Sequence, residues 1–162
     1  MTDRPDQSFD AAGTARRILT QTGTAALASL GDAGAPFASF VTVAPDAAGC
    51  PLLLLSQLAV HTRNVERDGR ASLLLVAPGG EGGDPLAGAR LTLEGHIVKL
   101  PKDSEEAADA RASFLARHPE AEGYAGFSDF SFYRLDISGG HLVAGFGRIV
   151  SLSPEDLRTD RA

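Results

Sequence analysis

The chain has 162 residues, of which 43% are hydrophobic and 22% charged, and these values are ordinary for a globular protein with one full core. No apolar run reaches 18 residues and the N-terminus MTDRPDQSFD has no apolar signal region, so we expect a cytoplasmic protein without a membrane span. The formal charge of −6 argues against nucleic acid as a partner, and a single cysteine, Cys50, excludes an intrachain disulfide and a cysteine-based zinc site.

The polar residues 1–7 are expected to form a disordered leader, followed by a single domain over residues 8–162. From Ser8 onward, apolar residues recur every three to four positions, which predicts a helix with Ser8 as its N-cap. Gly23 is a typical helix stop and is expected to end this helix.

Three strands joined by short turns are predicted next, and this spacing is typical of an antiparallel meander. The third is an unbroken apolar run, which indicates a strand covered on both faces. The strands are expected at Thr24–Leu30, Pro36–Ala44 and Leu52–Leu55, with turns at 31–34 and 45–49.

The second half of the chain alternates strands and helices. We expect a helix with Leu58 and Val65 on its buried face, and a Gly-rich connection after the strand that ends at Val76. Gly139–Gly140 is expected to be a turn. The remaining elements are predicted as strands at Ser72–Val76, Arg90–Leu100 (bent at Gly95), Ser131–Ile137 and His141–Val150, and as helices at Lys102–Arg117 and after Ser153. Together these elements indicate a mainly β fold, an antiparallel barrel with peripheral helices.

Hydrogen-bond donors and cations gather where the apolar run 52–55 ends and the next helix begins. The free N–H groups and the dipole of a helix N-terminus favour anions, and basic side chains strengthen that preference. The segment is therefore a candidate phosphate site, and our first hypothesis is that it holds the phosphate of flavin mononucleotide (FMN). Its polar residues are Ser56, Gln57, His61, Thr62, Arg63 and Asn64.

Three segments in order resemble the FMN-binding split-barrel proteins related to pyridoxamine 5′-phosphate oxidase, and more narrowly their haem-utilisation and haem-degrading branch. The resemblance extends over about residues 15–148. The segments are SQLAVHTRNVERDGRASLLL, DPLAGARLTLEGHIVKL and ARASFLARHPEAEGYAGFSDFSFYRLDISGGHLVAGFGR.

The resemblance implies a six-stranded antiparallel split barrel that forms a homodimer, with FMN at the subunit interface. It implies that the second strand, residues 38–42, lines the flavin and that the strand end and following helix hold its phosphate. The cofactor-binding residues it indicates are Ser39, Phe40, Val41, Thr42, Ser56, Gln57, His61, Thr62 and Arg63.

Two positions depart from the oxidase pattern. His61 stands where the oxidases usually have lysine, and Ala38 stands where they have arginine. The C-terminal arginine and histidine motif that binds their substrate has no counterpart either, which argues against the vitamin B6 reaction itself. The haem branch often carries an additional C-terminal domain, which we expect this chain to lack.

Three functions stay open at this point. The first is an FMN-dependent oxidoreductase acting on an unidentified small molecule, with hydride exchanged at the flavin and no catalytic residue or metal ligand assigned in the protein. The second is a flavin or haem carrier without turnover, and the third is a structural dimer with an empty cleft. His141 is a candidate haem ligand or flavin neighbour in the second case, and a surface or packed histidine otherwise. His96 and His118 are expected to be structural.

Overall fold

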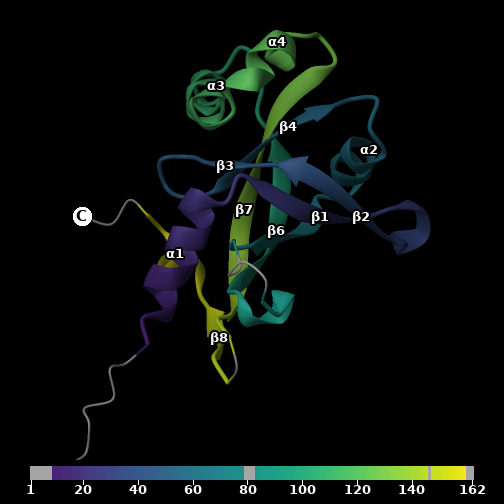
Figure 1. Cartoon of the computed structure of the whole chain (residues 1–162). Helices are drawn as coiled ribbons and strands as arrows, with labels where there is room; N and C mark the ends of the chain where they lie inside the picture. Colours follow the sequence, from purple (N-terminus) through teal and green to yellow (C-terminus); the bar gives the residue numbers. More distant parts are fainter. Residues whose placement is uncertain (1–8, 79–82, 146, 160–162) are drawn as a thin grey trace, which may run out of the picture.

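The computed structural model describes residues 9–78, 83–145 and 147–159. The leader expected at residues 1–7 and the predicted N-cap Ser8 lie outside this part. All strands belong to one antiparallel sheet in the order β2-β1-β5-β6-β7-β4-β3, with β8 paired to β7 (Figure 1). The strands are β1 (Thr24–Leu30), β2 (Pro36–Thr42), β3 (Ala44–Pro45), β4 (Pro51–Ser56), β5 (Arg70–Val76), β6 (Arg90–Lys99), β7 (Phe130–Val143) and β8 (Ile149–Leu152).

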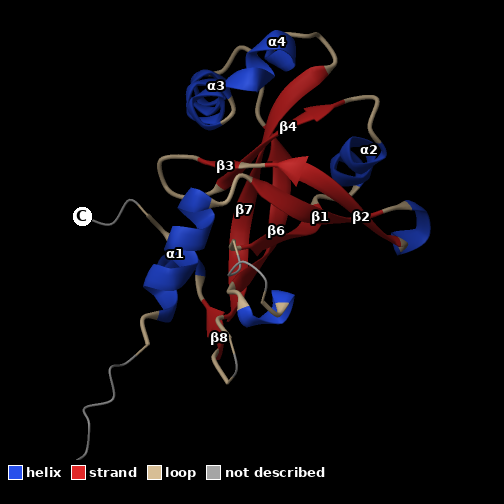
Figure 2. Cartoon of the chain, in the orientation of Figure 1, coloured by secondary structure: helices blue, strands red, loops and turns tan. Residues whose placement is uncertain are grey.

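The helices lie around this sheet, and Figure 2 shows them in blue at its ends and on its outer side. Short 3-10 turns supplement them. The helices are α1 (Ala11–Gln21), α2 (Val60–Arg67), α3 (Glu105–Arg117), α4 (Glu122–Ala125) and α5 (Pro154–Leu157), and the 3-10 turns are η1 (Asp32–Gly34), η2 (Pro85–Ala87) and η3 (Pro119–Ala121). Within the described ranges no helix has both the length and the apolar character needed to cross a membrane.

The two ends of the strand order, β2 and β3, are separated in the chain by Val43 alone. The backbone N–H of Val43 donates to the carbonyl of Gly23, 2.9 Å away, at the point where the chain passes from one strand to the other. Because neighbouring residues cannot lie far apart, the sheet must curl until its ends meet. The predicted mainly β barrel with peripheral helices is confirmed in this coarse form.

The sheet of the described residues has eight strands rather than the six that the resemblance implied. The strand expected at Pro36–Ala44 divides at Val43 into β2 and β3. The turn expected at Gly139–Gly140 is also wrong, because β7 continues as a strand through both glycines and Gly140 pairs with Leu93 of β6 and Leu152 of β8. A Cβ at position 140 would lie 3.0 Å from Leu157, so this glycine allows α5 to pack closely against the strand.

Two hydrophobic cores explain the apolar run of β4. Leu53 and Leu55 point into the curled sheet, where α1 contributes to the same core, and both side chains are buried. Leu52 and Leu54 point to the outer side and are buried under α3 and α4. Alternate residues of a strand face opposite sides, so a strand covered on both sides must be apolar throughout. The prediction that this strand is covered on both faces is confirmed.

Helix boundaries differ from expectation where a side chain caps the helix. Asp10 accepts a hydrogen bond from the N–H of Gly13 at 2.9 Å and starts α1. Ser104 caps α3 in the same way, so this helix begins at Glu105 rather than at Lys102. Leu58, expected to be buried, is 81% exposed, because it precedes α2, which begins at Val60.

Candidate functional site

A groove with a volume of about 430 Å³ lies between strand β2, the end of β4 and the start of β7. It contains five of the residues predicted to bind a cofactor, which come from three separate elements. Its walls are otherwise apolar or aromatic, which is typical of a site for a flat organic ligand. The lining residues are Phe40, Val41, Thr42, Leu54, Leu55, Ser56, Ala59, His61, Tyr124 and Phe130.

His61 is the histidine that lines this groove. It is half-buried, and its Nδ1 lies 2.9 Å from Ser39 Oγ on strand β2. Burial lowers the pKa of His61 below its ordinary value, so the imidazole is neutral at pH 7. Within the described residues Nε2 has no hydrogen bond. A neutral imidazole with one ring nitrogen held and the other unengaged is able to coordinate a metal centre.

Ser56 anchors the floor of the groove. Its hydroxyl donates to Asp129 Oδ2 at 2.8 Å and accepts from the N–H of Leu58 at 3.1 Å. The backbone N–H of Gln57 donates to the carbonyl of Asp129 at 2.7 Å. These bonds tie the end of β4 to the segment before β7, and they leave little hydrogen-bonding capacity at Ser56 for a ligand.

Four predicted site residues do not line the groove: Ser39, which contacts His61, and also Gln57, Thr62 and Arg63. The Gln57 side chain donates to Tyr133 Oη at 3.1 Å and to Glu66 Oε1 at 2.9 Å. Tyr133 in turn donates to Glu66 Oε1 at 2.6 Å, and this bond lowers the pKa of Glu66. Burial, followed by the same hydrogen bond, raises the pKa of Tyr133. Thr62 is fully buried and its hydroxyl has no partner in the described part of the chain. Arg63 is exposed, again without a side-chain partner among those residues.

His141 lies far from the groove. It is exposed and within strand β7, where it pairs with Thr92 and Ser151. It stands eleven residues after Phe130 on the same strand, which places it on the order of 35 Å away at about 3.3 Å per residue. His118 is buried, with Nε2 2.8 Å from the carbonyl of Val43 and Nδ1 3.2 Å from Glu120, so both of its ring nitrogens are engaged.

The aromatic wall was not predicted as part of the site. Tyr124 and Phe130 both line the groove, and their rings pack with centroids 5.0 Å apart. The signal was present in the sequence, because PEAEGYAGFSDF combines several aromatic residues with no regular periodicity. Leu54, Leu55 and Ala59 complete the lining, and apolar residues of this kind cannot be told from core residues by pattern.

Comparison with known proteins places the chain in a family. The family model described as "CREG, beta-barrel" matches residues 6–157. The chain is 40% identical over 105 residues to the chloroplastic haem oxygenase HOZ of Arabidopsis thaliana, a match covering 64% of this chain and 30% of that protein. It is 29% identical over 135 residues to the haem oxygenase HutZ of Vibrio cholerae, which covers 83% of this chain and 76% of HutZ.

Solved structures agree with this placement. A haem-binding protein from Mycobacterium smegmatis has a TM-score of 0.85 and 40% identity, over 96% of this chain and 61% of that one. A Clostridium acetobutylicum protein of the pyridoxinephosphate oxidase family shares the fold, with a TM-score of 0.66 at 11% identity over 90% of this chain and 96% of that one. The chain thus spans less than two thirds of the length of the plant and mycobacterial relatives.

These matches confirm the resemblance to the oxidase-like split barrels and their haem-utilisation branch. They contradict FMN as the cofactor, because the plant, Vibrio and mycobacterial relatives described above are named as haem-binding or haem-degrading proteins. The identity of the bound group could not be read from a resemblance that the flavin and haem proteins share. With residues 6–157 matched by its model, the chain belongs to the CREG β-barrel family.

Proposed function

We propose that this protein binds haem in the groove beside His61 and acts as a haem-binding or carrier protein. The observation that carries the proposal is the state of His61 in the groove: a half-buried imidazole, kept neutral by burial, with Nδ1 against Ser39 and Nε2 unengaged in the described residues. The names of the plant, Vibrio and mycobacterial relatives support the same ligand.

The residues that line the groove have the chemical character that a haem site needs. Leu54, Tyr124 and Phe130 provide an apolar and aromatic surface for a macrocycle, and the volume of about 430 Å³ lies within the usual range for ligand sites. No group of three or more His, Cys, Asp or Glu side chains in the described residues could hold a bare metal ion. Haem brings most of the iron ligands with its macrocycle, so a single histidine of the protein would suffice to hold it.

In this proposal each residue of the chain has a defined task. His61 would hold the iron of a bound haem through its unengaged ring nitrogen, and Ser39 orients the imidazole through Nδ1. The aromatic wall excludes water from one face of the groove. When bound, haem would supply a redox-active iron at which dioxygen can bind.

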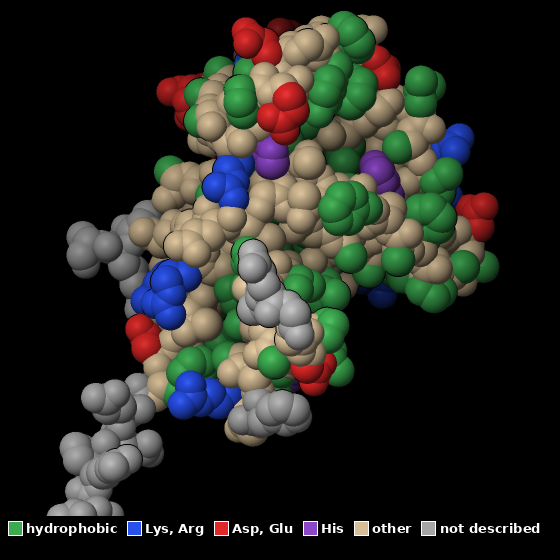
Figure 3. All heavy atoms as spheres, in the orientation of Figure 1, with side chains coloured by type: hydrophobic (Ala, Val, Ile, Leu, Met, Phe, Trp, Pro, Cys, Tyr) green, Lys and Arg blue, Asp and Glu red, His purple; other side chains and the backbone are tan. Residues whose placement is uncertain are grey.

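A homodimer is part of the proposal. Phe40, Ala26 and Leu74 form a row across β2, β1 and β5 on the outer side of the sheet, and Phe40 is 76% exposed. Figure 3 shows hydrophobic side chains gathered over the region of β1, β2 and α2. Exposed apolar patches of this kind mark contact surfaces. Since Phe40 also lines the groove, a second copy seated here would border the haem site.

Haem degradation is the second candidate function. Two of the relatives are named haem oxygenases, and one of them is matched over 76% of its length. Degradation would need dioxygen and an external electron donor in addition to the groove. A carrier needs neither, and the two functions can be separated by adding a reductant.

Titration of the purified protein with haemin tests the proposal. We expect a saturable Soret band with a shifted maximum, and no corresponding binding of FMN. Addition of ascorbate in air should at most shift this band by reducing the iron, with its intensity kept, for a carrier, and should bleach it progressively for a degrading enzyme. A protein that leaves the haemin spectrum unchanged at stoichiometric concentration would refute haem binding.

A further inference from the structure

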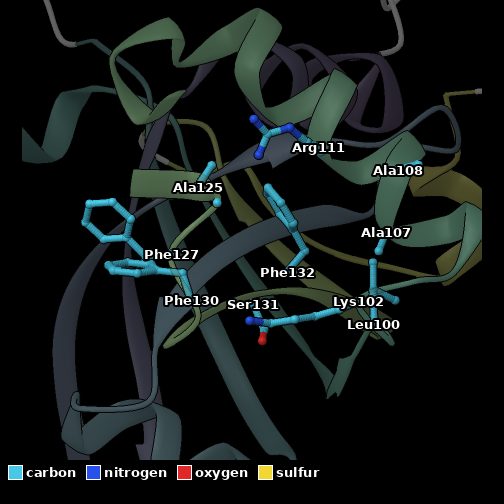
Figure 4. Close-up of a pocket in the computed structure, with 11 residues that line it drawn as sticks. Leu100, Lys102, Ala107, Ala108, Arg111, Ala125, Phe127, Phe130, Ser131 and Phe132 are labelled. Carbon is cyan, nitrogen blue, oxygen red and sulfur yellow. The ribbon is translucent and has the colours of Figure 1, made fainter. Parts of the chain in front are cut away.

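A second cavity, of about 280 Å³, lies on the other side of Phe130 from the haem groove. Its wall is formed by three phenylalanines of the α4–β7 segment, and its remaining apolar surface comes from α3 and the end of β6 (Figure 4). The lining residues are Leu100, Lys102, Ala107, Ala108, Arg111, Ala125, Gly126, Phe127, Phe130, Ser131 and Phe132.

The three phenylalanines of this second cavity are held in place by ring packing. Phe127 and Phe130 pack edge to face with centroids 6.4 Å apart, and Phe132 packs against buried Phe114 in the same way at 5.7 Å. Such pairs add to the stability that burial gives. The cavity therefore offers preformed aromatic surface to a flat or linear apolar group.

Two cations border this apolar space. In Figure 4 the side chains of Arg111 and Lys102 extend on opposite sides of Phe132. Lys102 Nζ donates to the carbonyl of Ser128 at 2.6 Å, which uses one of its three donors. Arg111 belongs to α3, and in Figure 4 its side chain extends from the helix on the side of Ala125 and Phe132.

Arg111 differs from most arginines in the described part of the chain. Arg16, Arg67 and Arg134, for example, are engaged by a carbonyl or a carboxylate. Arg111 is half-buried, and among the described residues its guanidinium has neither an ion pair nor a hydrogen bond. A partly desolvated guanidinium with five free donors is costly unless an anion or water satisfies it.

We propose that this cavity binds a small carboxylic acid with an apolar body, of the arylalkanoate class. The carboxylate pairs with Arg111 in the bidentate geometry that guanidinium favours, and the apolar body packs on Phe127, Phe130 and Phe132. The volume suits a small ligand rather than a macrocycle. This inference goes beyond haem binding and does not rest on it, since Phe130 is the one residue that lines both spaces.

Calorimetric titration with phenylbutyrate, in the absence of haemin, tests the assignment. The matched neutral probe is phenylbutanol, which has the same apolar body without the charge. Arg111→Gln removes the guanidinium, and Arg17→Gln, an exposed residue of α1 with a bond only to Thr14, removes the same charge at a distance. Ala108→Phe fills the mouth from an exposed position of α3 without touching the buried core.

Saturable phenylbutyrate binding is expected, with affinity at least about tenfold above that of phenylbutanol, as one charge-assisted pair provides. Arg111→Gln should abolish this difference, Ala108→Phe should abolish binding of both probes, and Arg17→Gln should change nothing. Equal affinity for acid and alcohol, an unaffected Arg111→Gln variant, or the absence of saturable binding to the folded wild-type protein would each overturn the assignment. Because haemin is absent, failure here would leave the haem proposal untouched.

Discussion

The Nδ1 atom of His61 lies 2.9 Å from Ser39 Oγ, and this contact joins helix α2 to strand β2 at the edge of the groove. Two elements that are separated by more than twenty residues in the chain thereby determine the orientation of one imidazole. Nearby, Asn64 Nδ2 donates to Ser29 Oγ at 3.1 Å, so α2 is held to the inner side of the sheet by two adjacent contacts. The imidazole is thus preorganised for a ligand.

Ser39→Ala should weaken haemin binding, because it removes the hydrogen-bond partner that orients His61. Loss of such a partner typically costs about 10–100-fold in affinity for a metal-bound group. Ser138→Ala is the matched control, since its hydroxyl donates to the carbonyl of Glu94, away from the groove. Haemin titration of both variants checks the effect, and equal dissociation constants for the two would argue against an orienting role for Ser39.

Stability should fall as the pH is lowered through the range in which His61 titrates. Burial lowers the pKa of His61 from its ordinary value of 6.5, so below neutral pH the unfolded state binds more protons than the folded state. The free energy of unfolding should then decrease as the pH falls from about 7 to the lowered pKa of His61. Below that pKa, His61 should make no further change to the free energy of unfolding. His61→Gln should flatten this part of the profile in urea titrations, whereas an unaltered slope would show that other groups cause it.

Phe40→Asp should disrupt the proposed dimer. The side chain is mostly exposed in one copy, so the substitution should leave the fold intact, but it would bury a carboxylate in an apolar contact. Light scattering should report a shift from dimer to monomer, with weaker haemin binding because the groove loses part of its border. Thr20→Asp, on the exposed side of α1, adds the same charge elsewhere. A Phe40→Asp variant that keeps the wild-type mass would rule out this surface.

Gly95→Ala should be strongly destabilising. The register of β6 against β7 shifts between Glu94 and Gly95, and a Cβ at position 95 would lie 2.1 Å from the carbonyl oxygen of Asp136. The backbone must move to relieve this overlap, so we expect the free energy of unfolding to fall by about 3 kcal/mol. Gly123→Ala, which meets nothing within 4 Å, should be neutral or slightly stabilising. Comparable melting temperatures for the two variants would contradict the bulge geometry.

Local sequence patterns predicted the fold where residues close in the chain determine the structure. The strand predicted at Thr24–Leu30 is present and buries one face, and the continuous apolar run of β4 is buried on two faces. The bend at Gly95 was also predicted correctly. Gly139–Gly140 was misread as a turn, because Gly140 is small to allow the approach of Leu157, seventeen residues away in the chain. Long-range packing of this kind leaves no local signal.

Only one wall of the groove could be predicted from the sequence. His61 and Ser56 belong to a polar cluster after an apolar strand, a pattern visible in sequence, and both line the groove. Tyr124 and Phe130 form the opposite wall, and only the pairing of Ser56 with Phe130 across β4 and β7 brings them near. The polar cluster alone favoured FMN, a prediction that the named haem relatives contradict.

The most direct test of the account is the haemin titration of His61→Ala beside His141→Ala, each checked for folding by circular dichroism. If His61 holds the haem iron, His61→Ala should lose about a hundredfold or more in affinity and the Soret maximum should shift, since the axial ligand is gone. His141→Ala, exposed on β7 and remote from the groove, should bind haemin like the wild-type protein. Unchanged binding and an unchanged spectrum in folded His61→Ala would contradict the proposed site.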